Sequence, residues 1–312
     1  MTSLRDVQTH LLLLACALLL ALGVRCAAAW KLAKQTPAGS RFEFGDSDTY
    51  WELGAAIARG EPYAYGPREY RVMRTPGYPL LLATLQRATG GAAGPWEARM
   101  LSIALGLIAV AATYFLGRWI FTPSVGLLAA FLAALSPCAA ASSAVVLAEA
   151  PFIPVMLAQL ACFWGMLTAK TTQQLLLCSA LVGLLAGVGA LIRPSWLLFT
   201  PLVLLAALLL PLKDASPSRR MRIVGAAAAM IALCVAMAPW WIRNYQVSGR
   251  WIATTLQAGP SLYDGWRPDA DGSSDMRFVE EFEARADQEG VLPRVGINRE
   301  LALDAQMSAA AK

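Results

Sequence analysis

About seven apolar stretches, each near the ~20 residues that a helix needs to cross a bilayer, limit what this chain can fold into. They cover residues 11–30, 100–120, 125–142, 152–169, 175–192, 196–212 and 223–242. Hydrophobic residues make up 57% of the 312 residues and charged residues only 15%, which is more apolar than a soluble core of this size requires. The sequence therefore predicts an all-α polytopic membrane protein.

The basic residues between these stretches predict how the chain is oriented. Arg5 precedes the first stretch, while Arg118, Lys170 and residues 213–222 lie in short connections on one side of the predicted membrane. Cytoplasmic connections are enriched in Lys and Arg, so the alternate connections face outward. The net charge of +5 is then mostly a topology signal, and no nucleic-acid partner is implied.

A cleaved signal peptide is the alternative interpretation of the first stretch, because residues 11–24 form a short apolar core followed by Ala27-Ala28-Ala29. Further spans follow, and Arg25 can extend to the interface from near the outer end, which favours an uncleaved helix. The expected units are a first transmembrane helix (1–30), an outer loop (31–97), a bundle of about six helices (98–242) and an outer C-terminal segment (243–312). Since no later span follows that segment, it reads as truncated.

The sequence lacks the residues that several classes of enzyme need for catalysis. The one histidine, His10, precedes the first span, which excludes a Ser-His-Asp triad and a His-rich metal site. The six cysteines lie within or beside apolar stretches without Cys-x-x-Cys spacing. No Gly-x-x-x-x-Gly-Lys loop occurs, so ATP hydrolysis is unsupported.

Polar residues from five separate stretches fall at the predicted outer face: Asp46, Arg74, Glu149, Arg193 and the pair 243–244. A carboxylate there can act as a general base toward a hydroxyl. Guanidinium groups suit a lipid phosphate, because their planar fork donates two parallel charge-assisted hydrogen bonds. Their joint placement indicates an interfacial site more strongly than any single residue does.

Each of these residues also has a purely structural interpretation. Asp46 and Asp48 can cap a helix expected over 48–59 and stopped by Gly60, and Glu149 can be a favourable charge at a helix N-terminus. The arginines can reach the interface by extending their side chains. Tyrosines of the loop, including Tyr78, can pack it internally or present ring faces to a sugar.

Five ordered motifs carry a family resemblance. They are Gly45-Asp46-Ser47-Asp48-Thr49-Tyr50, Arg74-Thr75-Pro76-Gly77-Tyr78-Pro79, Ala148-Glu149-Ala150-Pro151-Phe152, Ile192-Arg193-Pro194 and Pro239-Trp240-Trp241-Ile242-Arg243-Asn244-Tyr245. This set resembles the bacterial family 39 glycosyltransferases, GT-C-fold relatives of dolichyl-phosphate-mannose protein mannosyltransferases and of the lipid A aminoarabinose transferase. The resemblance runs from about residue 11 to residue 260.

The resemblance implies a GT-C-like helix bundle in the cell inner membrane, with its active site on the extracytoplasmic side. A polyprenyl-phosphate sugar would donate its sugar to a hydroxyl of a glycolipid, polysaccharide or protein, with Asp46 as the general base. The expected substrate-binding residues are Asp48, Tyr50, Arg71, Arg74, Tyr78, Glu149, Arg193, Arg243 and Asn244. No nucleotide cofactor is expected, no metal ligands are assigned, and the residues do not decide whether a divalent cation takes part.

The chain departs from the family pattern in two places: many members have Asp-Glu where this sequence has Asp46-Ser47, and members usually carry more spans after the second outer segment. Asp48 is the expected partial replacement for the missing carboxylate. The rival function is a non-catalytic flippase or transporter of lipid-linked sugars, which predicts charges near the bilayer midplane or paired broken helices. Here the charges collect at one face, which favours an interfacial enzyme.

Overall fold

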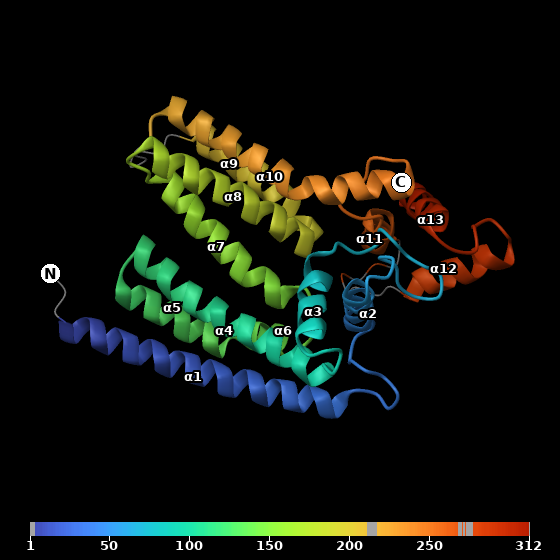
Figure 1. Ribbon diagram of the computed structural model, residues 1–312, viewed down its shortest axis with the longest axis horizontal. Helices are drawn as coiled ribbons and strands as arrows, with labels where there is room; N and C mark the ends of the chain where they lie inside the picture. Colours follow the sequence, from blue (N-terminus) through green and yellow to red (C-terminus); the bar gives the residue numbers. More distant parts are fainter. Residues whose placement is uncertain (1–3, 211–216, 268–269, 271, 273–276, 312) are drawn as a thin grey trace.

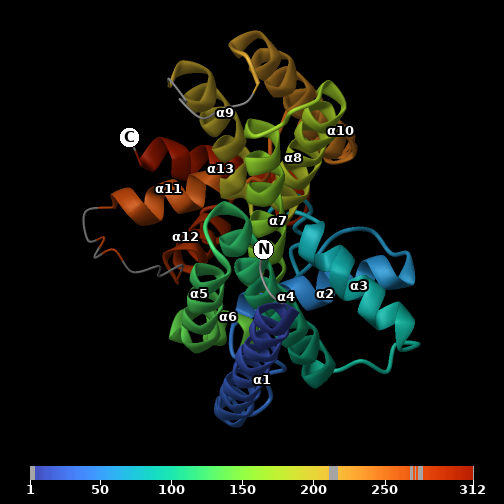
Figure 2. The ribbon, with the colours of Figure 1, turned by 90° about the vertical axis from the view of Figure 1, so that its left-hand side faces the viewer.

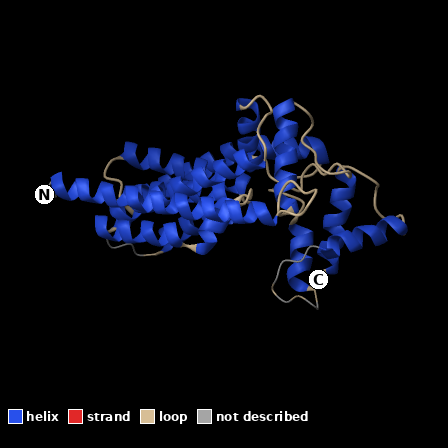
Figure 3. Cartoon of the chain, turned by 90° about the horizontal axis from the view of Figure 1, so that it is seen from below, coloured by secondary structure: helices blue, strands red, loops and turns tan. Residues whose placement is uncertain are grey.

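The regular structure of the protein is helical. The computed structural model describes residues 4–210, 217–267, 270, 272 and 277–311, and none of these forms a named strand (Figures 1 and 3). The helices are α1 (Leu4–Gln35), α2 (Gly45–Arg59), α3 (Gly77–Ala88), α4 (Pro95–Ile120), α5 (Pro123–Leu135), α6 (Pro137–Ala144), α7 (Glu149–Leu167), α8 (Thr172–Ile192), the 3-10 helix η1 (Pro194–Leu198), α9 (Phe199–Leu209), α10 (Arg219–Ser248), α11 (Ala258–Trp266), α12 (Arg277–Gln288) and α13 (Ile297–Ala310).

Among the described residues, five helices are long and apolar enough to cross a membrane, namely α1, α4, α7, α8 and α10. They run roughly parallel or antiparallel as one bundle, seen from its end in Figure 2. Backbone amides and carbonyls have no water partners in lipid, and a helix pairs them within the segment. The predicted all-α polytopic membrane protein is confirmed.

Two of the seven predicted spans differ from the expectation. The stretch 125–142 is broken between α5 and α6, which are bent by 59°, because Ser136 caps α6 and Pro137 cannot continue α5. The stretch 196–212 begins as the 3-10 helix η1 and continues as α9, giving a shorter apolar helix over Pro194–Leu209. Lys213, used to orient the chain, lies outside the described residues.

Glycines allow the spans to approach closely. A Cβ added at Gly183 of α8 would collide with the backbone oxygen of Ala229 in α10, and one at Gly187 would collide with Ala236. Lipid tails are as apolar as side chains, so membrane helices associate through such close packing rather than through a hydrophobic driving force. The α8–α10 contact therefore depends on residues that have no side chain.

Arg25 does not extend to the interface, and that expectation is wrong. Its side chain is 1% exposed and points into the bundle, where Nη1 donates to Ala134 O at 3.2 Å and Nη2 to Ala133 O at 3.3 Å. These carbonyls belong to the last turn of α5, which loses helical partners at the break before Pro137. Arg25 thus supplies hydrogen-bond donors to carbonyl groups at the end of the broken helix.

Helices α2, α3, α11, α12 and α13 lie together beyond one end of the bundle (Figure 1). We call the described residues of 36–94 and 249–311 the cap; it contains α2, α3, α11, α12 and α13. An apolar cluster joins its two halves, since Val72 and Met73 pack against Ile252, Leu256 and helix α13. The two parts of the cap are far apart in the sequence yet share one core.

Buried charges add to this junction. Glu300 of α13 has no exposed surface and accepts hydrogen bonds from the amides of Arg71 and Val72, the latter at 2.8 Å. Burial raises the pKa of the Glu300 carboxyl, and the amide donors partly offset this rise. Arg299, equally buried, pairs with Asp287 at 2.5 Å. Helix α13 is therefore fixed to the segment that precedes Arg74.

Candidate functional site

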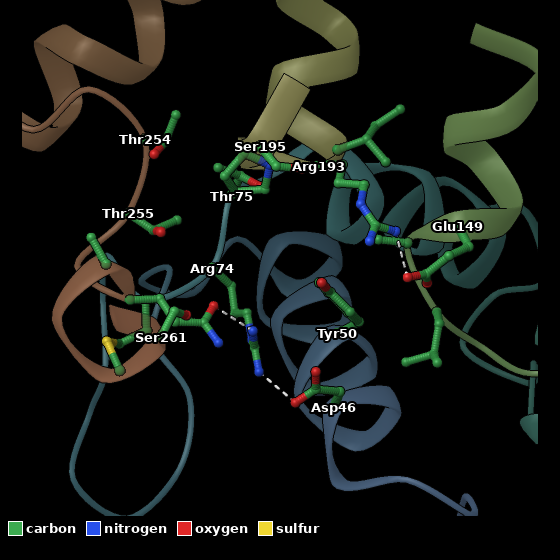
Figure 4. A pocket seen from close by; sticks show the side chains of 17 residues that line it. Asp46, Tyr50, Arg74, Thr75, Glu149, Arg193, Ser195, Thr254, Thr255 and Ser261 are labelled. Atoms are coloured by element: carbon green, nitrogen blue, oxygen red, sulfur yellow. Dashed lines mark hydrogen bonds and ion pairs between the residues drawn. The ribbon is translucent and has the colours of Figure 1, made fainter. Parts of the chain in front are cut away.

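A cavity of about 550 Å³ lies where the bundle meets the cap (Figure 4). This volume is within the usual range for small-molecule sites. Its lining comes from α2, the segment before α3, the start of α7, the turn between α8 and η1, and the segment 254–261. Of the residues predicted for the site, those that line it are Asp46, Tyr50, Arg74, Glu149 and Arg193.

Asp46 lies in the first turn of α2, which begins at Gly45 rather than at residue 48. Phe44 is the N-cap residue and makes no side-chain capping bond, so the capping interpretation of Asp46 does not hold. The Asp46 carboxylate pairs instead with Nη2 of Arg74 and is about half exposed, at 53%. A carboxylate in a first helical turn is favoured by the helix dipole.

Arg74 is held on several sides. Its Nη1 donates to Gln257 Oε1 at 2.7 Å and its guanidinium carbon lies 5.7 Å from the ring centre of Tyr50. Burial lowers the pKa of Arg74, but Asp46 and three neighbouring tyrosines together outweigh this effect, so the pKa is raised overall. Arg74 is therefore a fixed positive charge within the cavity.

The glycine of the Arg74-Thr75-Pro76-Gly77 motif explains why Arg74 reaches the bundle. A Cβ at Gly77 would lie 2.6 Å from the backbone oxygen of Leu191, near the C-terminus of α8. Only a residue without a side chain permits this approach. It brings the start of α3 against the end of α8 and places Arg74 and Arg193 in one cavity.

Glu149 and Arg193 form a second ion pair on another side of the cavity (Figure 4). Glu149 opens α7, and Arg193 follows the last residue of α8 in extended backbone, the conformation favoured before Pro194. Their Oε1 and Nη1 atoms are 2.6 Å apart, and the two side chains are 37% and 43% exposed. Arg193 can therefore bind an entering anion.

Tyr50 projects its hydroxyl into the open centre of the cavity (Figure 4). Burial raises the pKa of Tyr50, so the phenol stays protonated at neutral pH and can donate a hydrogen bond. Tyr78 packs against it with ring centres 5.3 Å apart, but has no exposed surface and does not line the cavity. Tyr78 therefore supports Tyr50 from behind.

Arg243 and Asn244 brace the site instead of lining it. Arg243 donates to the carbonyls of Arg71 and Tyr63, at 2.8 and 3.2 Å. Asn244 is fully buried and donates to Thr254 O at 3.5 Å. Their motif at the end of α10 thus holds backbone on both sides of the cavity.

Two other predicted residues face elsewhere. Arg71 pairs with Glu69 at 2.9 Å and lines a different hollow of the cap. Asp48 lines a third hollow, with Arg41 and Arg59. Neither is brought into the cavity, so Asp48 does not supply the second carboxylate there.

Sequence reasoning did not find the wall formed by the segment after α10. Its polar members are Thr254, Thr255, Gln257 and Ser261. They follow Gly249, which ends α10 in a left-handed conformation, and no charge or motif marks them. Thr75 and Ser195 also line the cavity; Thr75 directly follows Arg74 and Ser195 lies two residues after Arg193, which was a signal that could have identified them.

The charged groups of the lining are two arginines and two carboxylates. No group of three or more His, Cys, Asp or Glu in the described part of the chain is arranged to hold a metal ion. The cavity therefore offers positive charge for an anion, a carboxylate for a proton, and several hydroxyls. Such a set suits group transfer to or from a phosphate-bearing ligand.

Comparison with known proteins agrees with this chemistry. No curated protein sequence matches the chain significantly. The family model described as dolichyl-phosphate-mannose-protein mannosyltransferase matches residues 74–242, from Arg74 to the end of the bundle. Because this match covers more than half of the chain, the protein belongs to that family of GT-C membrane glycosyltransferases.

Proposed function

We propose that the protein transfers a sugar from a polyprenyl-phosphate donor to an acceptor hydroxyl at the extracytoplasmic face of the cell inner membrane. The observation that carries this proposal is the convergence of Asp46, Arg74 and Arg193 on one cavity at the end of the bundle. The acceptor is a glycolipid, a polysaccharide or a protein. The resemblance of the five sequence motifs to bacterial family 39 enzymes supports a lipid-linked donor.

Each charged residue of the cavity can be assigned a role toward one group of the substrates. Arg193, at the end of a span, and Arg74 would hold the donor phosphate, while Glu149 orients Arg193. Asp46 would accept the proton of the acceptor hydroxyl. The present Asp46–Arg74 pair requires that the phosphate share Arg74 with Asp46, or that the pair open when the donor enters.

The reaction is a single displacement at the anomeric carbon. The acceptor oxygen forms a bond to that carbon while the bond from the carbon to the phosphate oxygen breaks. The phosphate oxygen keeps the electron pair of the broken bond, and the leaving group is polyprenyl phosphate. The acceptor proton passes to the Asp46 carboxylate, and the configuration inverts. Holding both substrates at the lipid boundary supplies proximity, and the arginines stabilise the departing charge.

The test is release of polyprenyl phosphate from a panel of polyprenyl-phosphate sugars, using purified protein in nanodiscs. We expect wild type to release it and Asp46→Asn to lose roughly 10²- to 10⁴-fold in turnover, the usual contribution of a general base. Donor binding by Asp46→Asn should persist. Glu61→Gln, which removes an exposed carboxylate paired with Arg59, is the matched control and should keep full turnover.

Equal turnover of wild type and Asp46→Asn would reject Asp46 as the base. A wild-type protein that binds the donor and moves it between leaflets without releasing polyprenyl phosphate would instead support the flippase alternative.

A further inference from the structure

The cavity has a side whose own residues carry no charge and that the mechanism above does not use. Thr254, Thr255 and Ser261 lie opposite the Glu149–Arg193 pair (Figure 4). The segment that carries them follows α10 and belongs to the cap, whereas Glu149 and Arg193 are at the ends of α7 and α8. One side of the cavity therefore adjoins the spans and the other lies beyond them.

The backbone of this side is fixed. Thr254 O accepts hydrogen bonds from Trp240 Nε1 at 2.7 Å and from Asn244 Nδ2, while Ala253 O accepts one from Trp241 Nε1 at 2.8 Å. Leu256 N donates to Val72 O at 3.2 Å. The side chains of the segment are thus presented by a rigid support, as a specific binding site requires.

The hydroxyls on this side are available. Within the described residues, the side-chain hydroxyls of Thr254, Thr255 and Ser261 form no hydrogen bond with protein, nor does the hydroxyl of Tyr50. Gln257 accepts from Arg74 through Oε1, which leaves its Nε2 as a donor. A hydroxyl can both donate and accept a hydrogen bond, so these side chains match a ligand that is rich in hydroxyls.

We infer that Thr254, Thr255 and Ser261 form a subsite for the hydroxyl groups of the donor sugar. This inference rests on the proposed function, which places the phosphate at Arg193 and Arg74. A donor anchored in lipid then enters with its phosphate at the helix ends and its sugar beyond them, against segment 254–261.

The position of Arg74 sets where the sugar can lie. Arg74 borders the threonine side, because its Nη1 atom donates to Gln257 Oε1 at 2.7 Å. A phosphate held by Arg74 therefore places the attached sugar next to Thr254, Thr255 and Ser261, whose hydroxyls can donate hydrogen bonds to the sugar hydroxyls and accept hydrogen bonds from them.

The experiment measures binding of two probes that differ only in the sugar. A short-chain polyprenyl-phosphate hexose reports on the whole site, and polyprenyl phosphate alone reports on the phosphate position. Thr255→Val with Ser261→Ala removes two hydroxyls with little change in volume. We expect the Kd of the hexose donor to rise roughly 5-fold for one hydroxyl and about 20-fold for two, while the Kd of polyprenyl phosphate stays within about twofold.

Thr84→Val is the matched control. Thr84 is exposed on α3, its hydroxyl donates to Leu81 O at 2.7 Å, and it does not line the cavity. Neither Kd should change in this variant. Thermal unfolding of all variants checks that the cap is folded.

Two results would overturn the subsite. Equal weakening of both probes would mean that segment 254–261 binds phosphate, and unchanged binding of both would mean that it binds no part of the donor. A hexose-specific loss in a protein that never releases polyprenyl phosphate would support the subsite and reject the transferase.

Discussion

The bundle and the cap are held together by different kinds of residue. Helices α8 and α10 meet at Gly183, whereas the two halves of the cap meet through Glu300, whose side chain has no exposed surface and accepts from two backbone amides. In lipid, small residues allow close packing. In the cap, short segments with modest apolar area are joined by charge-assisted hydrogen bonds to particular backbone groups. The bundle is therefore expected to respond to added bulk, and the cap to a change of charge.

The largest effect should come from Gly183→Val. The added side chain would collide with Ala229 O of α10, and overpacking of this kind costs about 3 kcal/mol or more. Thermal unfolding in nanodiscs should show a large drop in Tm, and gel filtration a loss of monodisperse protein. Gly23→Ala is the control, because a Cβ there meets nothing within 4 Å. Similar Tm values for the two variants would contradict glycine-dependent packing.

Arg25 is the exception within the bundle, so replacing it tests whether charge also matters there. Arg25→Met leaves the carbonyls of Ala133 and Ala134 without their donor, at a cost of about 2 to 3 kcal/mol in the free energy of unfolding. Arg25→Lys keeps a cation but loses the planar fork, so a smaller loss is expected. Unfolding in denaturant measures both. If Arg25→Met left the free energy of unfolding unchanged, the break between α5 and α6 would need no hydrogen bonds from Arg25.

The smallest effect is a pH dependence of the cap. Because burial raises the pKa of Glu300 above its ordinary 4.5, the native state binds the proton more tightly than the unfolded state. This stabilisation is complete below pH 4.5 and is lost as the pH rises through the raised value. The Tm difference between wild type and Glu300→Gln should change in that window, with wild type losing stability as pH rises.

Glu281→Gln, an exposed neighbour on α12, should keep the wild-type pH profile. The carboxyl of Asp304, whose pKa is also raised by burial, is present in every variant and cancels in the comparison. Parallel profiles for wild type and Glu300→Gln would remove Glu300 as a source of pH dependence.

Length and apolarity were enough to predict the membrane helices, and the position of Ser136-Pro137 could also have predicted the break in one of them. Arg25 was misjudged because its partners are carbonyls of α5, and no local pattern shows which residues will face a buried guanidinium. The Leu191 carbonyl, whose closeness makes glycine necessary at position 77, is likewise far from that position in the sequence.

For the candidate site, charged residues in the predicted outer loop identified Asp46 and Arg74, and those at the ends of predicted spans identified Glu149 and Arg193, because all of these places lie at one membrane face. The same argument placed Arg243 in the cavity, where it does not lie, because proximity to a face does not fix the direction of a side chain. Thr254 and its neighbours carry no charge, and their position depends on how the chain folds back after Gly249.

The attachment of residue 72 to Glu300 has a consequence for biosynthesis. The two residues are 228 positions apart, so at about 5 to 20 residues per second the ribosome needs roughly 10 to 45 s to make the second after the first. During this interval the loop that carries Arg74 lacks one wall of its core. Quality-control factors and proteases would therefore meet an unfinished loop in every newly made molecule, even where the membrane helices have already assembled.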